Sequence, residues 1–174
     1  PLTNEFGEKE PDMPTMHVST PLRDRNGVVV GIVAVRVDVK ALNDLMLSLK
    51  LGKTGETYLV NKDGYMVTES RFARDLKDMG FIKRRCALEL KLVNRETDEL
   101  TTGVKQCVTG NNGFDAKGYK DYRGIAVLGV WRWLPEFNWG VIAEINRDEG
   151  YGPAYHLNYL VSSVLIMLAF PIVI

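Results

Sequence analysis

Only a few side chains in this sequence have the type and spacing that enzyme chemistry requires. Gly52-Lys53-Thr54 is similar to the end of a phosphate-binding loop, but that pattern needs a glycine at the position of Leu47. There are two histidines, far apart, and the chain has no HExxH pair, no paired-cysteine zinc spacing and no serine nucleophile motif. We therefore predict no catalytic residue, no metal site and no cofactor, and we expect that this chain is not an enzyme.

The two cysteines, Cys86 and Cys107, can form a disulfide or remain as two buried thiols. Two cysteines in one small domain often pair in an oxidising compartment. A loop of this size would stabilise the fold by about 3 kcal/mol in the chain-entropy treatment. We predict the disulfide, and free thiols stay the alternative because cysteine geometry cannot be deduced from sequence.

Aromatic side chains gather in the last third of the chain, between Tyr119 and Trp139. Trp131 and Trp133 would share one face of a strand with Gly129, since alternate residues of a strand point to the same side. This face can be ordinary hydrophobic core. It can also be the wall of a pocket, in which the glycine leaves room for a small ligand.

The hydrophobic pattern predicts the elements that position these residues. Asn26-Gly27 is a hairpin signal, and the β-branched run 28–37 is so continuous that we expect both of its faces to be covered. Asp38 can cap an amphipathic helix that contains Met46. Other predicted strands are 17–21, 56–60, 65–69, 119–122, 125–134 and 139–145, with a short helix within 97–109 and a strand or helix at 86–92. Together they indicate an α+β domain with one central antiparallel sheet.

Charge and hydropathy limit the possible partners. Lys+Arg and Asp+Glu number 22 each, whereas a nucleic-acid-binding protein usually shows a basic surplus, so we expect no nucleic-acid partner. Residues 157–174 read LNYLVSSVLIMLAFPIVI, which is nearly long enough to span a bilayer. We predict a transmembrane helix there; the alternative is a buried helix of a soluble domain, which normally keeps a polar face. The start at Pro1 suggests a piece of a longer protein.

Three stretches of the sequence stand out together: GETYLVNKDG followed by TESR, GYKDYRG followed by VLG, and WRWL followed by WG and AEI. In this order and spacing they resemble the membrane-proximal module of double Cache (PAS-like) sensor domains. Residues 19–31 resemble the closing hairpin of the membrane-distal module, most of which has no counterpart in this chain. The resemblance implies a PAS-like (Cache) sheet flanked by helices, with a distal remnant at 1–38, the proximal module at 39–150 and a truncated transmembrane helix at 153–174.

The same resemblance implies a function and a set of site residues. The function is the extracytoplasmic sensor of a histidine kinase, chemoreceptor or similar receptor in the inner or plasma membrane, with residues 1–152 outside the cytoplasm and the protein a homodimer. Carried over position by position, the ligand-binding candidates are Tyr58, Glu69, Arg71, Tyr122, Trp131 and Glu144. Arg71 could bind a carboxylate ligand through two hydrogen bonds, although Arg71 and Glu69 could equally be the solvated end of a hairpin. A structural spacer that dimerises and binds no ligand is the alternative function.

Overall fold

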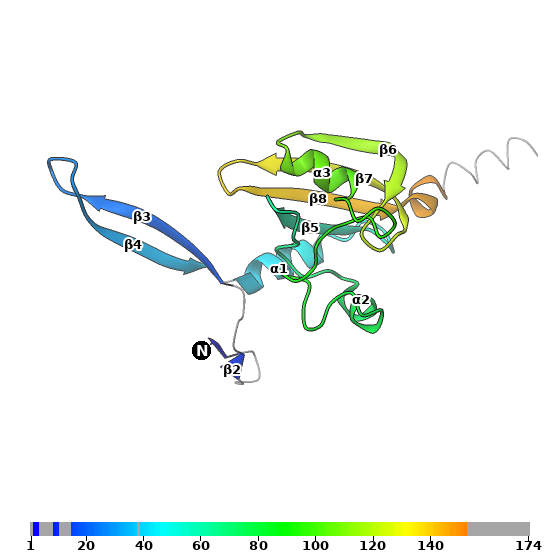
Figure 1. The fold of residues 1–174 in the computed structure, drawn as a ribbon, viewed down its shortest axis with the longest axis horizontal. Coiled ribbons are helices and arrows are strands. Elements are labelled where there is room, and N and C mark those ends of the chain that lie inside the picture. Colours follow the sequence, from blue (N-terminus) through cyan, green and yellow to red (C-terminus); the bar gives the residue numbers. More distant parts are fainter. Residues whose placement is uncertain (1, 4–8, 11–14, 38, 153–174) are drawn as a thin grey trace, which may run out of the picture. The chain divides into compact units, whose positions relative to one another are not determined.

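A computed structural model describes residues 2–3, 9–10, 15–37 and 39–152 (Figure 1). The chain divides into two compact units, Pro1–Leu45 and Met46–Ile174, and each is described by itself. The elements in chain order are β1 (Leu2–Thr3), β2 (Lys9–Glu10), β3 (Met16–Arg23), β4 (Val29–Val37), α1 (Val39–Ser48), β5 (Glu56–Asn61), α2 (Ala73–Asp78), α3 (Thr102–Val108), β6 (Gly113–Lys120), β7 (Ala126–Leu134) and β8 (Trp139–Asn146).

The N-terminal unit is dominated by an antiparallel hairpin of β3 and β4, which turns at the predicted Asn26-Gly27. Gly27 has a φ of +82°, a left-handed conformation that glycine adopts without steric penalty. The Asp24 carboxylate accepts hydrogen bonds from the backbone amides of Asn26 and Val28 at 2.8 and 2.9 Å. The turn residues of the sequence thus specify the hairpin correctly.

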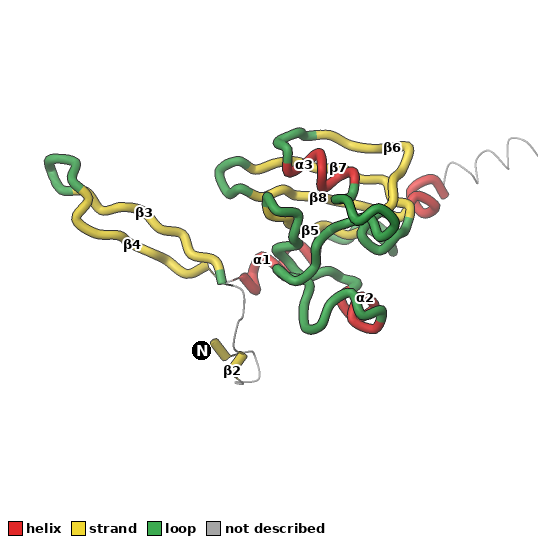
Figure 2. The backbone as a smooth tube through the Cα atoms, in the orientation of Figure 1, coloured by secondary structure: helices red, strands yellow, loops and turns green. Residues whose placement is uncertain are grey.

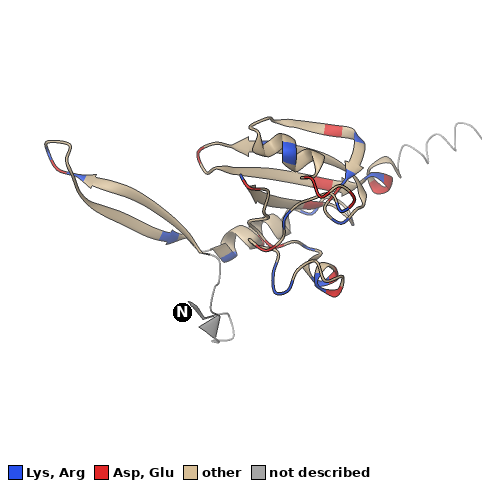
Figure 3. Cartoon of the chain, viewed as in Figure 1, with Lys and Arg blue, Asp and Glu red and all other residues tan. Residues whose placement is uncertain are grey.

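The prediction that both faces of the run 28–37 are covered is wrong for the described residues. Ile32 is 72% exposed and Val30 is 66% exposed. Charged side chains lie only at the two ends of the hairpin, so its middle is uncharged (Figure 3). β-Branched residues favour a strand because they suit a pleated surface. The run 28–37 therefore predicts the strand correctly, but its composition does not determine whether another layer covers the strand.

The C-terminal unit contains a four-stranded antiparallel sheet with the strand order β5-β8-β7-β6 (Figure 1). Helix α3 packs against all four strands. The segment between β5 and α3 is mostly turns and loops, apart from the short helix α2 (Figure 2). The predicted α+β class with one central antiparallel sheet is confirmed for this unit.

The predicted transmembrane helix at 153–174 lies outside the described residues. Within the described part of the chain, no helix combines the length and the apolar character that crossing a bilayer requires.

Residues 86–92 form neither the predicted strand nor the alternative helix. Cys86, Leu90 and Leu92 are buried, so the alternating pattern does mark burial, but Leu88 is 50% exposed. Leu88 also has a φ of +60°, which a β-strand cannot contain. An isolated bridge between Tyr65 and Lys91 pairs this stretch with the predicted strand 65–69, which itself forms only an isolated bridge with β5, between Val60 and Met66. The segment is therefore a series of turns that buries alternate side chains.

The hydrophobic core lies on the face of the sheet that carries α3. Strand alternation directs Val127 and Trp131 of β7 and Ile142 of β8 into this core, and all three are buried. Helix α3 approaches closely at Gly103, where an added β-carbon would lie 3.2 Å from the ring of Trp131 and 2.4 Å from the Tyr119 hydroxyl. Glycine at this position therefore sets the distance between the helix and the sheet.

Candidate functional site: a buried carboxyl pair and the C-terminal junction

Two glutamates lie opposite each other on neighbouring strands of the sheet, the edge strand β5 and the central strand β8. Glu56 of β5 and Glu144 of β8 are register partners, and their exposed fractions are 4% and 3%. Directly opposite residues of antiparallel strands have β-carbons about 4.5–5.5 Å apart. We call Glu56 and Glu144 the carboxyl pair. Their strands bring together two acidic groups that would ordinarily be solvated.

Glu144 is held by two tyrosines. Its Oε2 accepts a hydrogen bond from the Tyr58 hydroxyl at 3.0 Å, and its Oε1 accepts one from the Tyr119 hydroxyl at 2.5 Å. Burial raises the pKa of the Glu144 carboxyl from 4.5 to about 8, against the lowering effect of the Tyr119 hydrogen bond. Burial also raises the pKa of Tyr58 and Tyr119. The two phenols therefore stay neutral donors while Glu144 is the group that can titrate.

Glu56 is held by a different set of donors. The hydroxyls of Ser70 and Tyr122 each donate to its carboxylate at 2.5 Å, and the backbone amide of Arg71 donates at 2.9 Å. Burial raises the pKa of Glu56, while the hydrogen bonds from Ser70 and Tyr122 lower it. Tyr58 and Tyr122 meet edge to face, with ring centroids 5.9 Å apart, so the surroundings of the two carboxyls are continuous.

Trp131 packs beside this cluster. Its ring lies edge-on to Tyr119 with centroids 6.2 Å apart, and it is 7% exposed. Gly113 allows the contact, because a β-carbon there would lie 3.3 Å from the indole. Trp133, on the same strand, is only partly buried against the core. Trp131 is therefore a core residue of the candidate site, and Trp133 lies at its margin.

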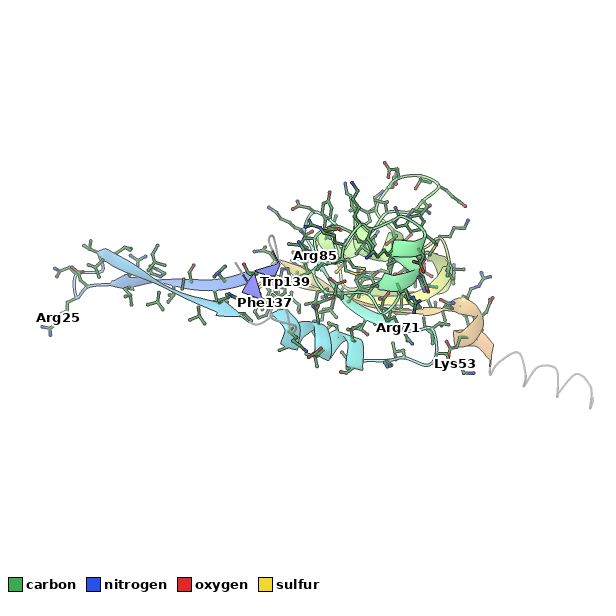
Figure 4. All side chains as sticks on the ribbon, turned by 90° about the horizontal axis from the view of Figure 1, so that it is seen from below. Arg25, Lys53, Arg71, Arg85, Phe137 and Trp139 are labelled. Atoms are coloured by element: carbon green, nitrogen blue, oxygen red, sulfur yellow. The ribbon has the colours of Figure 1, made fainter. Side chains whose placement is uncertain are left out.

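Glu69 and Arg71 are bonded to the polypeptide backbone. The Glu69 carboxylate accepts hydrogen bonds from the amides of Cys86 and Ala87 at 2.9 and 3.2 Å. The Arg71 guanidinium donates to the carbonyl of Gly55 and lies 5.4 Å from the Phe72 ring, at the lower edge of the unit in Figure 4. Both side chains hold loops in place, which differs from the solvated hairpin end considered above.

The structure thus brings four of the six predicted site residues into one buried cluster: Tyr58, Tyr122, Trp131 and Glu144. Sequence reasoning missed Glu56, Ser70 and Tyr119 as members. A signal for Glu56 was available, because strand alternation places it on the same face as Tyr58. Nothing local indicated Ser70, which directly follows the predicted strand 65–69 and is buried against Glu56 and Tyr122.

A buried ion pair connects this cluster to the end of β8. Arg123 Nη2 lies 2.6 Å from the Asp121 carboxylate and also donates to the Asn146 side chain at 3.2 Å. The guanidinium stacks over the Phe72 ring at 3.9 Å. Because Tyr122 stands between these two charged residues, the turn 121–124 contacts both the carboxyl pair and the last residue of β8.

The chain passes directly from β8 into a helical turn at 147–152, which is anchored to the loop 52–54. Glu149 accepts hydrogen bonds from the amides of Lys53 and Thr54 at 2.7 and 2.8 Å and from the Thr54 hydroxyl at 2.5 Å. The amide of Asn146 donates to the same hydroxyl at 3.1 Å. Figure 4 shows Lys53 beside this helical turn. We call residues 146–152 with the loop 52–54 the junction.

Gly52 makes the junction possible. Its φ is +60°, and an added β-carbon would lie 2.4 Å from Glu149 Oε1. Consecutive backbone amides in such a turn form a concave anion site. The stretch 52–54, which only superficially resembles a phosphate-binding loop, therefore binds a carboxylate of its own chain. These hydrogen bonds lower the pKa of Glu149.

The predicted disulfide between Cys86 and Cys107 is not formed. Both residues are buried free thiols. Cys86 contacts the backbone of Ser70, whereas Cys107 lies against Gly140 and the backbone of Arg132. Burial raises the pKa of the two thiols to about 12 and about 11. The cysteines fill the core on separate segments, which corresponds to the alternative that the sequence left open.

A family comparison decides the classification. The profile described as Cache domain matches residues 6–154. The chain belongs to the Cache domain family. Among curated proteins, none is similar enough to count as a relative of this Cache domain.

Solved structures share the fold of this Cache domain at low sequence identity. The extracellular domain of mmHK1S-Z3, assigned as a histidine kinase, has a TM-score of 0.56 and 15% identity, with 82% of this chain and 48% of that chain covered. The periplasmic sensory domain of the Campylobacter jejuni chemoreceptor Tlp1 has a TM-score of 0.50 and 20% identity, with 76% of this chain and 43% of that chain covered. The ligand-binding domain of the Pseudomonas aeruginosa PAO1 amino acid chemoreceptor PctB, in complex with L-Arg, has a TM-score of 0.50 and 18% identity, with 91% of this chain and 55% of that chain covered. The chain spans about half the length of these domains.

Proposed function

We propose that this Cache domain is the extracytoplasmic sensory part of a transmembrane signal-transduction receptor and that it is not itself an enzyme. In this proposal residues 39–150 form the membrane-proximal module, 1–38 end a membrane-distal module, and 153–174 enter the membrane. The output would be a cytoplasmic kinase or chemoreceptor signalling region. Support comes from the family match and from neighbours that are named as extracellular or periplasmic sensor domains.

The observation that carries the proposal is the junction. Strand β8 lies in the middle of the sheet and contains half of the carboxyl pair. It runs without a loop into the helical turn 147–152, and Glu149 fixes that turn to the loop before β5. Any shift of β8 relative to β5 therefore moves the helix that leads out of the domain. Displacements of about 1–2 Å are sufficient for helix-based switches.

We place the small-molecule site of the receptor in the membrane-distal module and assign a relay role to the module formed by 39–150. Around the carboxyl pair, the carboxyls of Glu56 and Glu144 already accept hydrogen bonds from the hydroxyls of Tyr58, Ser70, Tyr119 and Tyr122. PctB is in complex with L-Arg, so an amino acid is a reasonable first ligand to test here. The ligand would act through its different affinities for the two signalling states.

Crosslinking the junction in the full-length receptor tests the relay. Lys53→Cys and Asp148→Cys place two thiols on opposite sides of the junction, and Asp148 is exposed. Closing the pair with a short bismaleimide should fix the output and abolish its response to ligand. The single variant Lys53→Cys, treated in the same way, is the control. A fully crosslinked receptor that responds like the control would overturn the relay.

A structural spacer that dimerises without binding a ligand is the second candidate. It is favoured by the hydrogen bonds of the core, since the polar groups of Tyr58, Tyr122 and Glu144 already bond to groups of the same cluster. Thermal-shift measurements with a panel of amino acids on the whole extracytoplasmic region test for the ligand, because a ligand that binds the folded state raises Tm by mass action. The crosslinked receptor then distinguishes the two proposals, because a spacer would leave its response to that ligand the same as that of the control.

A further inference from the structure

The carboxyl pair is a poor arrangement for two negative charges. Glu56 and Glu144 are opposite in register and both nearly inaccessible to water. Burial disfavours the charged form of both carboxyls, and the charge of Glu56 adds to this effect at Glu144. A buried carboxyl that also faces a second acid can retain its proton at neutral pH.

The charges around the pair do not compensate for it. The positive charge of Arg123 lowers the pKa of Glu56, but Arg123 is already paired with Asp121. The negative charge of Asp121 in turn raises the pKa of Glu144. Arg71 contacts Glu56 through its amide, while its guanidinium bonds to the carbonyl of Gly55.

The titratable and charged groups that act on the pair are Tyr58 of β5, Tyr119 of β6, Arg71 after β5, Cys86, and Asp121, Tyr122 and Arg123 of the turn after β6. One step further out, Asp115 of β6 acts on Tyr119 and Glu69 acts on Cys86. Strand β7 contributes Gly129 and Trp131, which carry no charge.

We propose that the carboxyl pair is a proton-binding site, in which Glu144 carries a proton at neutral pH and releases it to solvent under mildly alkaline conditions. The domain would then respond to pH as well as to the ligand of the receptor. This role rests on the proposed sensory function and adds a second stimulus to it. The pKa of about 8 at Glu144 sets the range in which the change occurs.

Protonation changes the hydrogen bonds of Glu144 in a definite way. The carboxylate accepts from both Tyr58 and Tyr119. When one carboxyl oxygen carries the proton, that oxygen becomes a donor, and a tyrosine beside it has to accept. The hydroxyl of that tyrosine must then turn to another acceptor. Adding or removing one proton therefore rearranges the contacts between β5, β6 and β8.

The rearrangement has a short route to the junction. Asn146 lies two residues after Glu144 in β8. Its side-chain oxygen accepts a hydrogen bond from Arg123, and its backbone amide donates one to the Thr54 hydroxyl. Thr54 in turn donates to Glu149 in the helical turn. A shift of β8 at Glu144 thus reaches the helix through two consecutive hydrogen bonds. The junction that the relay uses is the same one that the proton would move.

The titration itself is measured by NMR on the 174-residue protein with 13C-labelled glutamate carboxyls. One carboxyl resonance should titrate with a midpoint near pH 8, and it should be missing in Glu144→Gln. Glu99→Gln is the matched control, because Glu99 is an exposed glutamate paired with Lys105, and that variant should keep the resonance. If every glutamate of the wild-type protein titrates below about pH 6, where exposed carboxyls do, the proton site does not exist. The wild-type spectrum decides this even if Glu144→Gln does not fold.

The response of the junction is measured separately. Spin labels at Arg132→Cys and Asp148→Cys report the distance between the exposed side of β7 and the helical turn, while the native thiols are buried. The distance should change with the midpoint of the carboxyl titration. A carboxyl that titrates near pH 8 with no change in this distance would refute the sensing role. Neither result depends on the amino acid panel, so failure of the proton site and failure of the ligand sensor are told apart.

Discussion

Replacing Gly129 by alanine tests whether Tyr119 is held as tightly as the structure indicates. A β-carbon at Gly129 would lie 2.2 Å from the Tyr119 hydroxyl oxygen and 2.9 Å from the ring carbon that carries it. Both distances are far below van der Waals contact, and the tyrosine is packed against Trp131. The Tyr119 ring must therefore move, and its hydrogen bond to Glu144 must break.

The size of the effect follows from two contributions. Overpacking a core typically destabilises a protein by about 1–3 kcal/mol. Leaving a buried polar group without its partner adds about 1–3 kcal/mol. We expect Gly129→Ala to lower the free energy of unfolding by about 2–6 kcal/mol and to lower Tm by on the order of 10 °C.

Urea unfolding followed by tryptophan fluorescence measures this loss. Gly152→Ala is the control, because among the described residues no atom outside its chain neighbours lies within 4 Å of the position where its β-carbon would be placed. That substitution should change stability by less than about 0.5 kcal/mol, as surface changes usually do.

A double-mutant cycle with Tyr119→Phe then identifies the cause. The phenylalanine removes the oxygen with the closest contact and also the hydrogen bond, so Gly129→Ala should be less damaging in this background by at least about 1 kcal/mol. An equal loss in both backgrounds, or a loss below about 0.5 kcal/mol in the wild type, would refute the packing argument.

Three further predictions address the other features. The folded-state pKa of Glu144 is raised to about 8 from an ordinary 4.5, so the stability that its proton contributes is complete below about pH 4.5 and is lost as the pH rises through 8. The free energy of unfolding, measured by urea titration, should therefore fall by about 5 kcal/mol in all over this range. In Glu144→Gln this dependence on pH should be much weaker. Glu149→Gln should loosen the junction, seen as faster amide exchange at Lys53 and Thr54, whereas Glu136→Gln should not. A reducing agent should leave Tm unchanged, and a thiol reagent should modify Cys86 and Cys107 only after denaturation; a Tm drop on reduction would indicate a disulfide.

The fold could be predicted from the sequence where turn residues and the alternation of apolar side chains indicate the same element. The turn at Asn26-Gly27 and the strands that became β7 and β8 follow directly from turn chemistry and alternation. Residues 86–92 could not be predicted, because alternating burial was produced by turns with a positive φ at Leu88. Alternation reports which side chains are buried and leaves the backbone conformation undetermined.

The candidate site was predictable only in part for a similar reason. Tyr58 and Glu144 lie on strands whose faces can be counted from the sequence. Glu69 and Arg71 were placed in the same site by family resemblance, yet tertiary contacts direct them to backbone groups. The anchoring of Glu149 joins residues nearly a hundred positions apart, a relation that no local pattern encodes. The predicted disulfide was wrong because two core positions happened to be cysteines on separate segments.

The hairpin of β3 and β4 has a practical consequence for making this protein. Both strands present an open backbone edge within the described residues, and the sides of β4 are apolar and solvent-accessible. Open apolar edges recruit further strands and lead to aggregation. Recombinant material consisting of residues 1–174 alone should therefore self-associate through the hairpin, and a lysine in place of Ile32 should improve its yield without altering the fold of the C-terminal unit.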